Sequence, residues 1–125
     1  MSKKIVLADD EKFIAIAYND GLTRAGYQVF VANDGEEALI KIKTEKPDLI
    51  LLDLIMPKMT GFEVLKAVKA DPELKGIPVV ILSNLSQATD ETEARGLGAA
   101  DFLIKSNLSL EDLVVRLKAH LDATN

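Results

Sequence analysis

The sequence predicts an α/β domain in which helices cover both faces of a five-stranded parallel sheet. Two observations lead to this prediction. Five short apolar runs alternate with five longer amphipathic stretches along 125 residues. The short runs are apolar at successive positions, as in strands buried on both sides. Strand and helix alternation favours parallel strands joined by right-handed crossovers, which gives a doubly wound (βα)5 three-layer sandwich.

The predicted strands are the five apolar runs. They occupy residues 5–8, 29–31, 49–52, 78–82 and 102–104. Runs of three to five residues suit strands and are too short for helices. The longest nearly apolar run, residues 49–56, contains Asp53 and is far too short to cross a bilayer.

The first and last helices are predicted from apolar residues spaced three and four apart. In the first helix, which ends before Gly26, the stripe comprises Ile14, Ala17, Tyr18, Gly21, Leu22 and Ala25. In the last helix the stripe comprises Leu110, Leu113, Val114, Leu117 and Leu121. The first helix also carries Asn19-Asp20-Gly21, which are poor helix formers, so packing must compensate for low propensity.

The three middle helices are predicted from their first residues. Asp34-Gly35-Glu36-Glu37 begins the second helix, and Thr60-Gly61-Phe62-Glu63 has the spacing of a capping box for the third. The fourth, residues 86–95, has few apolar anchors, namely Leu85, Ala88 and Ala94. We therefore expect the fourth helix to dock less firmly than the others.

Composition excludes several classes of function. The net charge is −5, with 20 acidic against 15 basic residues, which argues against direct nucleic-acid binding. The absence of cysteine excludes disulfides and thiolate chemistry, and one histidine is too few for a histidine-rich metal site. We interpret His120 as a surface residue. No secretory signal or membrane span is recognisable, so we expect a cytoplasmic protein.

Polar residues follow or end four of the predicted strands. They are Asp9, Asp10, Asp53, Ser83 and Lys105. Carboxyl ends of parallel strands meet at one edge of a sheet, where open α/β sheets bind ligands. Each residue alone has a structural explanation, such as a helix cap or a solvated lysine. Their convergence favours a functional site.

The chemistry of these residues points to phosphoryl transfer. Three neighbouring carboxylates repel one another unless a cation is present, and oxygen ligands favour a hard ion such as Mg²⁺. Lys105 supplies a second positive charge, and Ser83 supplies a hydroxyl donor. A carboxylate nucleophile, a cation and positioned donors are the groups that phosphoryl transfer requires.

These residues lie in a pattern that resembles the receiver domain of two-component response regulators. The pattern covers essentially the whole chain and comprises Asp9-Asp10, Asp53-Leu54-Ile55-Met56-Pro57, Gly61, Ser83 and Ala100-Asp101-Phe102-Leu103-Ile104-Lys105. The resemblance implies a flavodoxin-like fold with strand order 2-1-3-4-5 and a single receiver domain over residues 1–125. With no length left for an output domain, the expected output is a protein contact or a relay.

The resemblance also implies a role for each site residue. A sensor histidine kinase or phosphotransfer protein would phosphorylate Asp53, Ser83 would bind the phosphoryl group and Lys105 would pair with it. The implied Mg²⁺ ligands are Asp9, Asp10, Asp53 and the backbone carbonyl of Ile55. Phe102 would be an aromatic switch, buried on activation, that alters the face formed by the fourth helix, fifth strand and fifth helix. Such a protein catalyses only its own phosphorylation and dephosphorylation.

The sequence departs from the family pattern at several positions. Ser106 replaces the usual proline after Lys105, so the loop there is expected to differ in geometry. Asn84 replaces a small residue and is expected to narrow access to the site. Ile55 and Leu85 are apolar where the family controls dephosphorylation. They would exclude water and fail to orient it, which predicts a long-lived phosphorylated state.

Three other functions remain as alternatives. A phosphoaspartyl hydrolase of the haloacid dehalogenase type needs a second aspartate where Ile55 stands. A flavin module needs a Ser/Thr/Gly-rich loop where Asp9-Asp10-Glu11 would repel phosphate. A pseudo-receiver, acting as an interaction module without phosphorylation, would not need all five site residues. We expect the phosphoacceptor, with a downstream protein target and either a monomeric or a phosphorylation-dependent dimeric state.

Overall fold

The structure is a computed structural model that describes residues 2–84 and 88–123. Over these residues, strands and helices alternate along the chain. The strands are β1 (Lys4–Ala8), β2 (Gln28–Ala32), β3 (Leu49–Asp53), β4 (Val79–Ser83) and β5 (Asp101–Ile104). The helices are α1 (Lys12–Arg24), α2 (Gly35–Glu45), α3 (Gly61–Ala70), α4 (Ala88–Gly96), a 3₁₀ turn (Lys105–Asn107) and α5 (Leu110–Ala123).

The strands form one parallel sheet in the order β2-β1-β3-β4-β5, which confirms the predicted fold class and strand order. Its register aligns the carboxyl ends of the central strands. Ala8 of β1 pairs with Leu52 of β3, and Asp53 pairs with Leu82 of β4. The residues that follow β1 and β4 therefore flank the end of β3.

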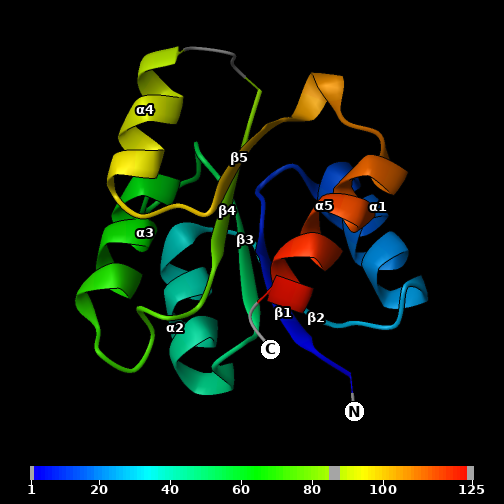
Figure 1. The fold of residues 1–125 in the computed structure, drawn as a ribbon, viewed down its shortest axis with the longest axis horizontal. Helices are drawn as coiled ribbons and strands as arrows, with labels where there is room; N and C mark the ends of the chain where they lie inside the picture. The colour runs from blue at the N-terminus through cyan, green and yellow to red at the C-terminus, as the bar shows by residue number, and fades with distance from the viewer. Residues whose placement is uncertain (1, 85–87, 124–125) are drawn as a thin grey trace.

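Helices cover both faces of the sheet, with α2, α3 and α4 on one side and α1 and α5 on the other (Figure 1). Alternate strand residues enter the two cores: Val6, Ile50 and Ile81 face the first group of helices, while Ile5, Leu49 and Val80 face the second. All six side chains are completely buried. Burial on both faces explains why the strands appear as continuous apolar runs rather than alternating ones.

The first helix is continuous through Asn19-Asp20-Gly21, as predicted, but its buried stripe differs from the prediction. Ala15, Tyr18 and Leu22 are buried, whereas Ala17 and Ala25 are exposed. Both sets satisfy helical spacing, because an apolar stripe is wide enough for small residues on either flank. The buried face was therefore decided by where α1 sits against the sheet.

Among the described residues, the fourth helix begins at Ala88. Residues 86 and 87, where the sequence predicted its start, lie outside the described residues. Of its described side chains, Ala94 alone is fully buried. This sparse packing confirms that α4 has few apolar anchors. None of the helices in residues 2–84 and 88–123 combines the length and apolar character that a membrane span requires.

Two features at the start of α3 bring this helix close to the end of β3. The predicted capping box is present, with Glu63 N–H donating to Thr60 Oγ1 at 3.2 Å and Thr60 N–H donating to Glu63 Oε1 at 3.0 Å. Gly61 lies directly against the end of β3, where a Cβ would stand 2.6 Å from the Asp53 carbonyl oxygen. The absence of a side chain at Gly61 lets α3 begin beside Asp53.

Candidate functional site

The five polar residues predicted at strand ends meet at one edge of the sheet. Asp53 and Ser83 are the last residues of β3 and β4, Asp9 and Asp10 follow β1, and Lys105 follows β5. Their convergence follows from the parallel topology, because every strand ends on the same side. The structure thus brings together all the residues of the predicted site.

Most of the site is buried. The exposed fraction is 0% for Asp9, 3% for Asp53, 2% for Ser83 and 8% for Lys105, whereas Asp10 is exposed. Lys105 Nζ lies 2.8 Å from Asp9 Oδ2 and 3.3 Å from Asp53 Oδ2. One ammonium group therefore compensates two buried carboxylates, which would otherwise be costly to desolvate.

Burial and charge oppose each other at this site. Burial raises the pKa of Asp53 to about 7; the positive charge of Lys105 works against this rise, and the negative charge of Asp9 adds to it. Burial alone would lower the pKa of Lys105, but the contact with Asp9 and the charge of Asp53 outweigh it and hold that pKa above its ordinary value. Lys105 is therefore a permanent cation, and Asp53 gains from a second cation nearby.

The carboxylates of Asp9, Asp10 and Asp53 form a cluster suited to a metal ion. One oxygen from each lies within 4.8 Å of the others. The contact of Asp9 Oδ2 with Lys105 is ionic, and this buried oxygen receives no well-aligned hydrogen bond within the part of the chain that the structure describes. Three carboxylates without nitrogen or sulfur ligands fit a hard divalent cation such as Mg²⁺.

A pocket of about 300 Å³ opens over Asp53. It is lined by Asp10, Glu11, Asp53, Leu54, Ile55, Ser83 and Asn84. Ile55 has an exposed fraction of 66%, so its apolar side chain lies at the rim as the sequence suggested. Leu85, the other apolar residue predicted to affect dephosphorylation, lies outside the described residues.

Glu11 belongs to this site and was not identified from the sequence. Its Oε1 accepts a hydrogen bond from Asn84 Nδ2 at 2.8 Å and another from Lys105 Nζ at 3.2 Å. The hydrogen bond from Asn84, and after it that from Lys105, lowers the pKa of Glu11. Its place directly after Asp9-Asp10 was the available signal, but a residue in a charged run is usually solvated.

Phe102 is buried, and Ser106 follows Lys105 through a trans peptide bond. The exposed fraction of Phe102 is 6%, and its side chain packs in the core with residues of α2, α3 and α4. The described residues include no cis peptide bond, so the bond between Lys105 and Ser106 is trans. A 3₁₀ turn, Lys105–Asn107, follows β5 directly.

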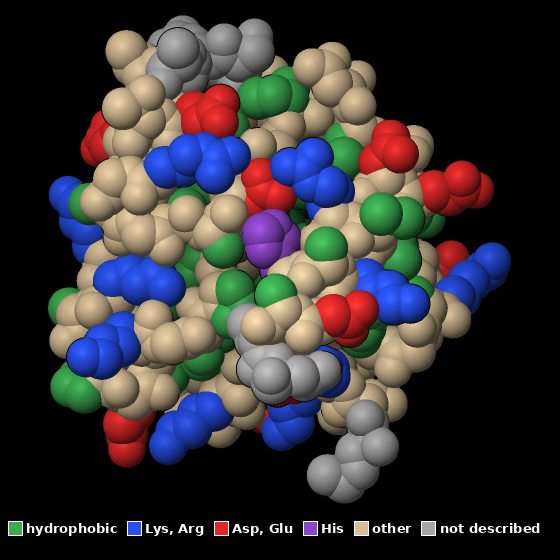
Figure 2. Space-filling model, in the orientation of Figure 1, with side chains coloured by type: hydrophobic (Ala, Val, Ile, Leu, Met, Phe, Trp, Pro, Cys, Tyr) green, Lys and Arg blue, Asp and Glu red, His purple; other side chains and the backbone are tan. Residues whose placement is uncertain are grey.

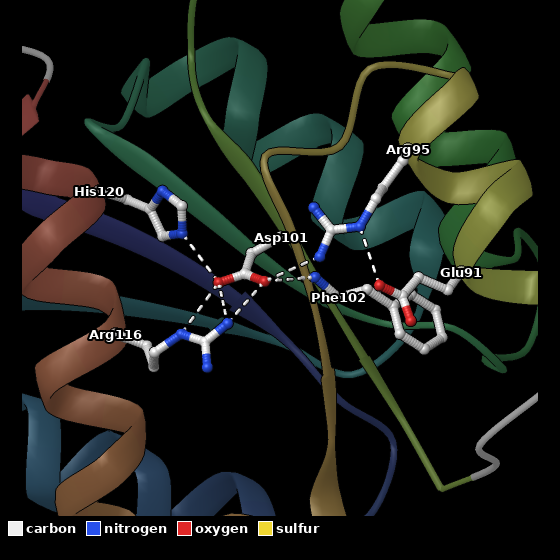
Figure 3. Close-up of polar contacts among 6 residues, drawn as sticks. All are labelled: Glu91, Arg95, Asp101, Phe102, Arg116 and His120. Carbon is white, nitrogen blue, oxygen red and sulfur yellow. Dashed lines mark hydrogen bonds and ion pairs between the residues drawn. The ribbon is translucent and has the colours of Figure 1, made fainter. Parts of the chain in front are cut away.

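A second polar cluster, also missed from the sequence, surrounds Asp101 at the start of β5. Arg116 of α5 donates two hydrogen bonds through Nη2, at 2.9 and 2.8 Å, and one through Nε at 3.2 Å (Figure 3). Arg95 of α4 approaches from the other side, with Nη2 at 3.4 Å. Asp101 is only 4% exposed. One buried carboxylate thus ties α4 and α5 to β5.

His120 lies at the surface, as predicted, but it also belongs to the Asp101 cluster, a contact that the sequence did not reveal. Its Nε2 lies 3.0 Å from Asp101 Oδ2, and its side chain is 26% exposed. Figure 2 shows this histidine near the centre of the face formed by α4, β5 and α5, with basic side chains beside it. Burial alone would raise the pKa of Asp101, but the contacts with His120 and Arg116 hold that pKa below its ordinary value.

Comparisons with known sequences identify close relatives. A family model described as "Response regulator receiver domain" matches residues 5–118. The chain is 40% identical over 121 residues to the "Alkaline phosphatase synthesis transcriptional regulatory protein PhoP" of Bacillus subtilis, covering 97% of this chain and 49% of that protein. It is 35% identical over 123 residues to the "Probable transcriptional regulator ycf27" of Guillardia theta, covering 98% and 47%. The chain thus spans about half the length of these relatives.

Solved structures with the same fold include a Francisella protein, described as "response regulator 1452 receiver domain". It has a TM-score of 0.91 and 32% identity, covering 99% of this chain and all of that chain. Another is the "Chemotaxis response regulator CheY4" of Vibrio cholerae, with a TM-score of 0.89 and 33% identity, covering 96% of this chain and 99% of that chain.

Proposed function

The chain belongs to the response regulator receiver domain family, a family of signalling switches, and on that premise we propose that it accepts a phosphoryl group on Asp53 from a phosphohistidine. The observation that carries the proposal is the set of charges around Asp53. Lys105 Nζ lies 3.3 Å from Asp53 Oδ2, and the carboxylates of Asp9 and Asp10 lie within 4.8 Å. A buried nucleophile between a fixed cation and a pair of carboxylates that could hold a metal ion suits attack on a phosphorus atom.

In the proposed reaction, an Asp53 carboxylate oxygen attacks the phosphorus of the phosphohistidine. A phosphorus–oxygen bond forms, the phosphorus–nitrogen bond breaks, and the electron pair returns to the imidazole, which takes up a proton. Lys105 stabilises the charge on the transferred oxygens, and the Ser83 hydroxyl donates to one of them. Ser83 ends β4 and Lys105 directly follows β5, so both side chains are positioned before the donor arrives.

The proposal includes Mg²⁺ held by Asp9, Asp10, Asp53 and the backbone carbonyl of Ile55. When bound, the ion supplies positive charge that offsets the three carboxylates and the incoming phosphoryl oxygens. Asp9 contributes a buried oxygen that lacks a well-aligned hydrogen bond from the described residues, and Asp10 contributes an exposed carboxylate. Support for this assignment comes from the donor set, which contains oxygen ligands alone.

The proposed output face comprises α4, β5 and α5. A phosphoryl group on Asp53 adds charge and acceptor oxygens, which would draw Ser83 inward and make room beside Phe102. Because Phe102 is only 6% exposed in this structure, the proposed change concerns which atoms its ring packs against. Asp101 precedes Phe102 and contacts both α4 and α5, so a shift of β5 would reach both helices.

The proposed partners are a sensor histidine kinase or phosphotransfer protein upstream and a protein target downstream. Phe13 and Ile16 on α1 are 89% and 65% exposed, and they are candidates for the upstream contact. We further propose that residues 1–125 form a single receiver domain in the cytoplasm. Its expected state is a monomer or a phosphorylation-dependent dimer.

The test is phosphorylation by a small acyl phosphate in the presence of Mg²⁺, measured as intact mass. The expected result is one added phosphoryl group on the parent protein and none on Asp53→Asn. Asp122→Asn makes the same change at an exposed position of α5 and should be phosphorylated like the parent. No adduct on the parent, together with no beryllofluoride binding, would favour the pseudo-receiver. Steady hydrolysis of phosphate esters would favour a hydrolase.

We also propose a long-lived phosphorylated state. Ile55 is an apolar side chain at the rim of the pocket over Asp53 and offers no group to orient an attacking water. Ile55→Asn should therefore shorten the lifetime of the phosphorylated protein, measured by intact mass after removal of the donor. Rapid dephosphorylation of the parent that Ile55→Asn leaves unchanged would contradict this proposal.

A further inference from the structure

Glu11 and Asn84 are joined by a hydrogen bond that passes over the end of β3. Asn84 Nδ2 donates to Glu11 Oε1 at 2.8 Å. Glu11 lies just beyond β1 and Asn84 just beyond β4, and β3 lies between these strands in the sheet. A side-chain link between the two must therefore cross above the end of β3, which is Asp53.

The joined pair forms an outer layer of the site. Glu11 and Asn84 line the same 300 Å³ pocket as Asp53. Asn84 is exposed and the Glu11 side chain is 40% exposed, whereas the Asp53 side chain beneath them is 5% exposed. Glu11 and Asn84 therefore form the more exposed part of the pocket wall, beside the buried Asp53.

The same pair also engages the cation of the site. Lys105 Nζ lies 3.2 Å from Glu11 Oε1 and 3.3 Å from Asp53 Oδ2, so the two carboxylates share one ammonium group. A phosphoryl group on Asp53 brings additional negative charge to Lys105 and competes with Glu11 for it. Glu11 is thus held in place from two sides, by Asn84 and by Lys105, and phosphorylation would weaken the contact with Lys105.

We propose that Glu11 and Asn84 form a bridge that narrows the pocket over Asp53 and opens when the phosphoryl group enters and when water removes it. This inference rests on the proposed phosphoacceptor function, and in it Glu11 competes with Asp53 for Lys105. The bridge restrains exchange at Asp53 in both directions. Its opening is coupled to the reaction because the phosphoryl group takes Lys105 from Glu11.

The first test measures the rate constants of phosphorylation by a small acyl phosphate and of dephosphorylation after donor removal. Asn84→Ala and Glu11→Ala should each raise both rate constants about 3- to 10-fold, the range expected for one partly exposed hydrogen bond to a charged group. The double variant should be no faster than the faster single variant, because both changes break one bridge.

The variant Glu11→Gln separates the effect of the negative charge of Glu11 from the effect of its hydrogen bond with Asn84. This variant keeps an oxygen that can accept from Asn84 but removes a negative charge that repels an anionic donor. Its phosphorylation should accelerate less than that of Glu11→Ala, and the gain should shrink at high salt, since salt screens exposed charges. Glu73→Gln removes the same charge from an exposed residue that follows α3, at the opposite edge of the sheet, and should leave both rate constants unchanged.

A second measurement uses the parent protein alone. The side-chain amide resonance of Asn84, identified by its loss in Asn84→Ala, should shift in Glu11→Ala and also when beryllofluoride and Mg²⁺ bind the parent. An Asn84 amide that neither change affects would overturn the bridge. So would single variants whose rate constants stay within about twofold of the parent, or effects that multiply in the double variant.

The outcomes distinguish this inference from the proposed function. A parent that gains a phosphoryl group at a rate unaffected by the bridge variants retains the phosphoacceptor function and loses the bridge. Absence of an adduct on the parent and on every bridge variant overturns both. An adduct that appears only after the bridge is removed supports both.

Discussion

At the scale of single residues, Asp53 is held where burial disfavours its charged form. Burial raises its pKa to about 7 from its ordinary value of 3.8. The folded protein therefore binds this proton more tightly than the unfolded chain does. The stability that the protonated carboxyl contributes is present below the unfolded pKa and is lost as the pH rises through 7.

The raised pKa of Asp53 leads to a prediction about how stability depends on pH. Without divalent cations, the free energy of unfolding of the parent should fall relative to that of Asp53→Asn between about pH 4 and pH 7, by about 1–4 kcal/mol in total. Urea unfolding of both proteins across this range in a chelating buffer measures the difference. A difference that is independent of pH would contradict the raised pKa.

Gly61 gives a second prediction at the same scale. A Cβ at this position would stand 2.6 Å from the Asp53 carbonyl oxygen and 3.0 Å from the Leu54 Cα, both of them backbone atoms that cannot move cheaply. Gly61→Ala should destabilise the protein by about 1–3 kcal/mol and slow phosphorylation of Asp53. Gly76 has nothing within 4 Å of its built Cβ, so Gly76→Ala should stay within about 0.5 kcal/mol of the parent in urea unfolding.

At the scale of elements, Asp101 links β5 to α5 more closely than to α4. Arg116 makes paired contacts as short as 2.8 Å, whereas Arg95 makes one contact at 3.4 Å. The Arg116 side chain is 51% exposed, so solvent screening reduces the strength of its pair with Asp101. The shorter and paired contacts of Arg116 still predict that Asp101 is coupled more strongly to Arg116 than to Arg95.

A double-mutant cycle tests that inequality. The Asp101–Arg116 pair should give a coupling energy of about 1–2 kcal/mol and the Asp101–Arg95 pair less than about 0.5 kcal/mol, from alanine substitutions and urea unfolding. The Asp20–Arg24 pair on α1, with side chains 57% and 80% exposed, is a control that should give at most about 0.5 kcal/mol. Equal coupling to Arg95 and Arg116 would refute the assignment.

The helices α4 and α5 should also differ in local stability. Ala94 is the one fully buried side chain described in α4, whereas α5 buries Leu113, Leu117 and Leu121. Because little apolar surface holds α4, its backbone amides should exchange with solvent faster than those of α5. Hydrogen exchange resolved by residue measures this, and equal protection of the two helices would show that α4 is docked by other contacts.

At the scale of the whole molecule, the acidic cluster should make stability depend on a divalent cation. Asp9, Asp10 and Asp53 repel one another, and a ligand that binds the folded state alone stabilises it by mass action. At about 100 times its Kd, Mg²⁺ should add about 2.7 kcal/mol and raise Tm by several degrees. Thermal unfolding at matched ionic strength tests this prediction, and the gain should largely disappear in Asp10→Asn, an exposed substitution.

The sequence alone was sufficient for the strands, their order by resemblance and the place of the site. Short apolar runs that alternate with amphipathic stretches are typical of parallel strands covered by helices, and parallel strands carry their ends to one edge. Asp9, Asp53, Ser83 and Lys105 were therefore brought together by topology, which needs no knowledge of side-chain conformation. The capping box at Thr60 was equally predictable, because both partners lie within one helical turn.

Only the tertiary structure decided contacts that depend on lateral distance and side-chain direction. Glu11 reaches Asn84, 73 positions away, because a single strand, β3, lies between β1 and β4. His120 at the surface contacts Asp101 because α5 packs beside the start of β5. The packing of α1 against the sheet likewise decided that Ala15 is buried and Ala17 is exposed. Sequence periodicity fixes which faces are apolar, whereas the packing of elements far apart in the chain fixes which side chains meet.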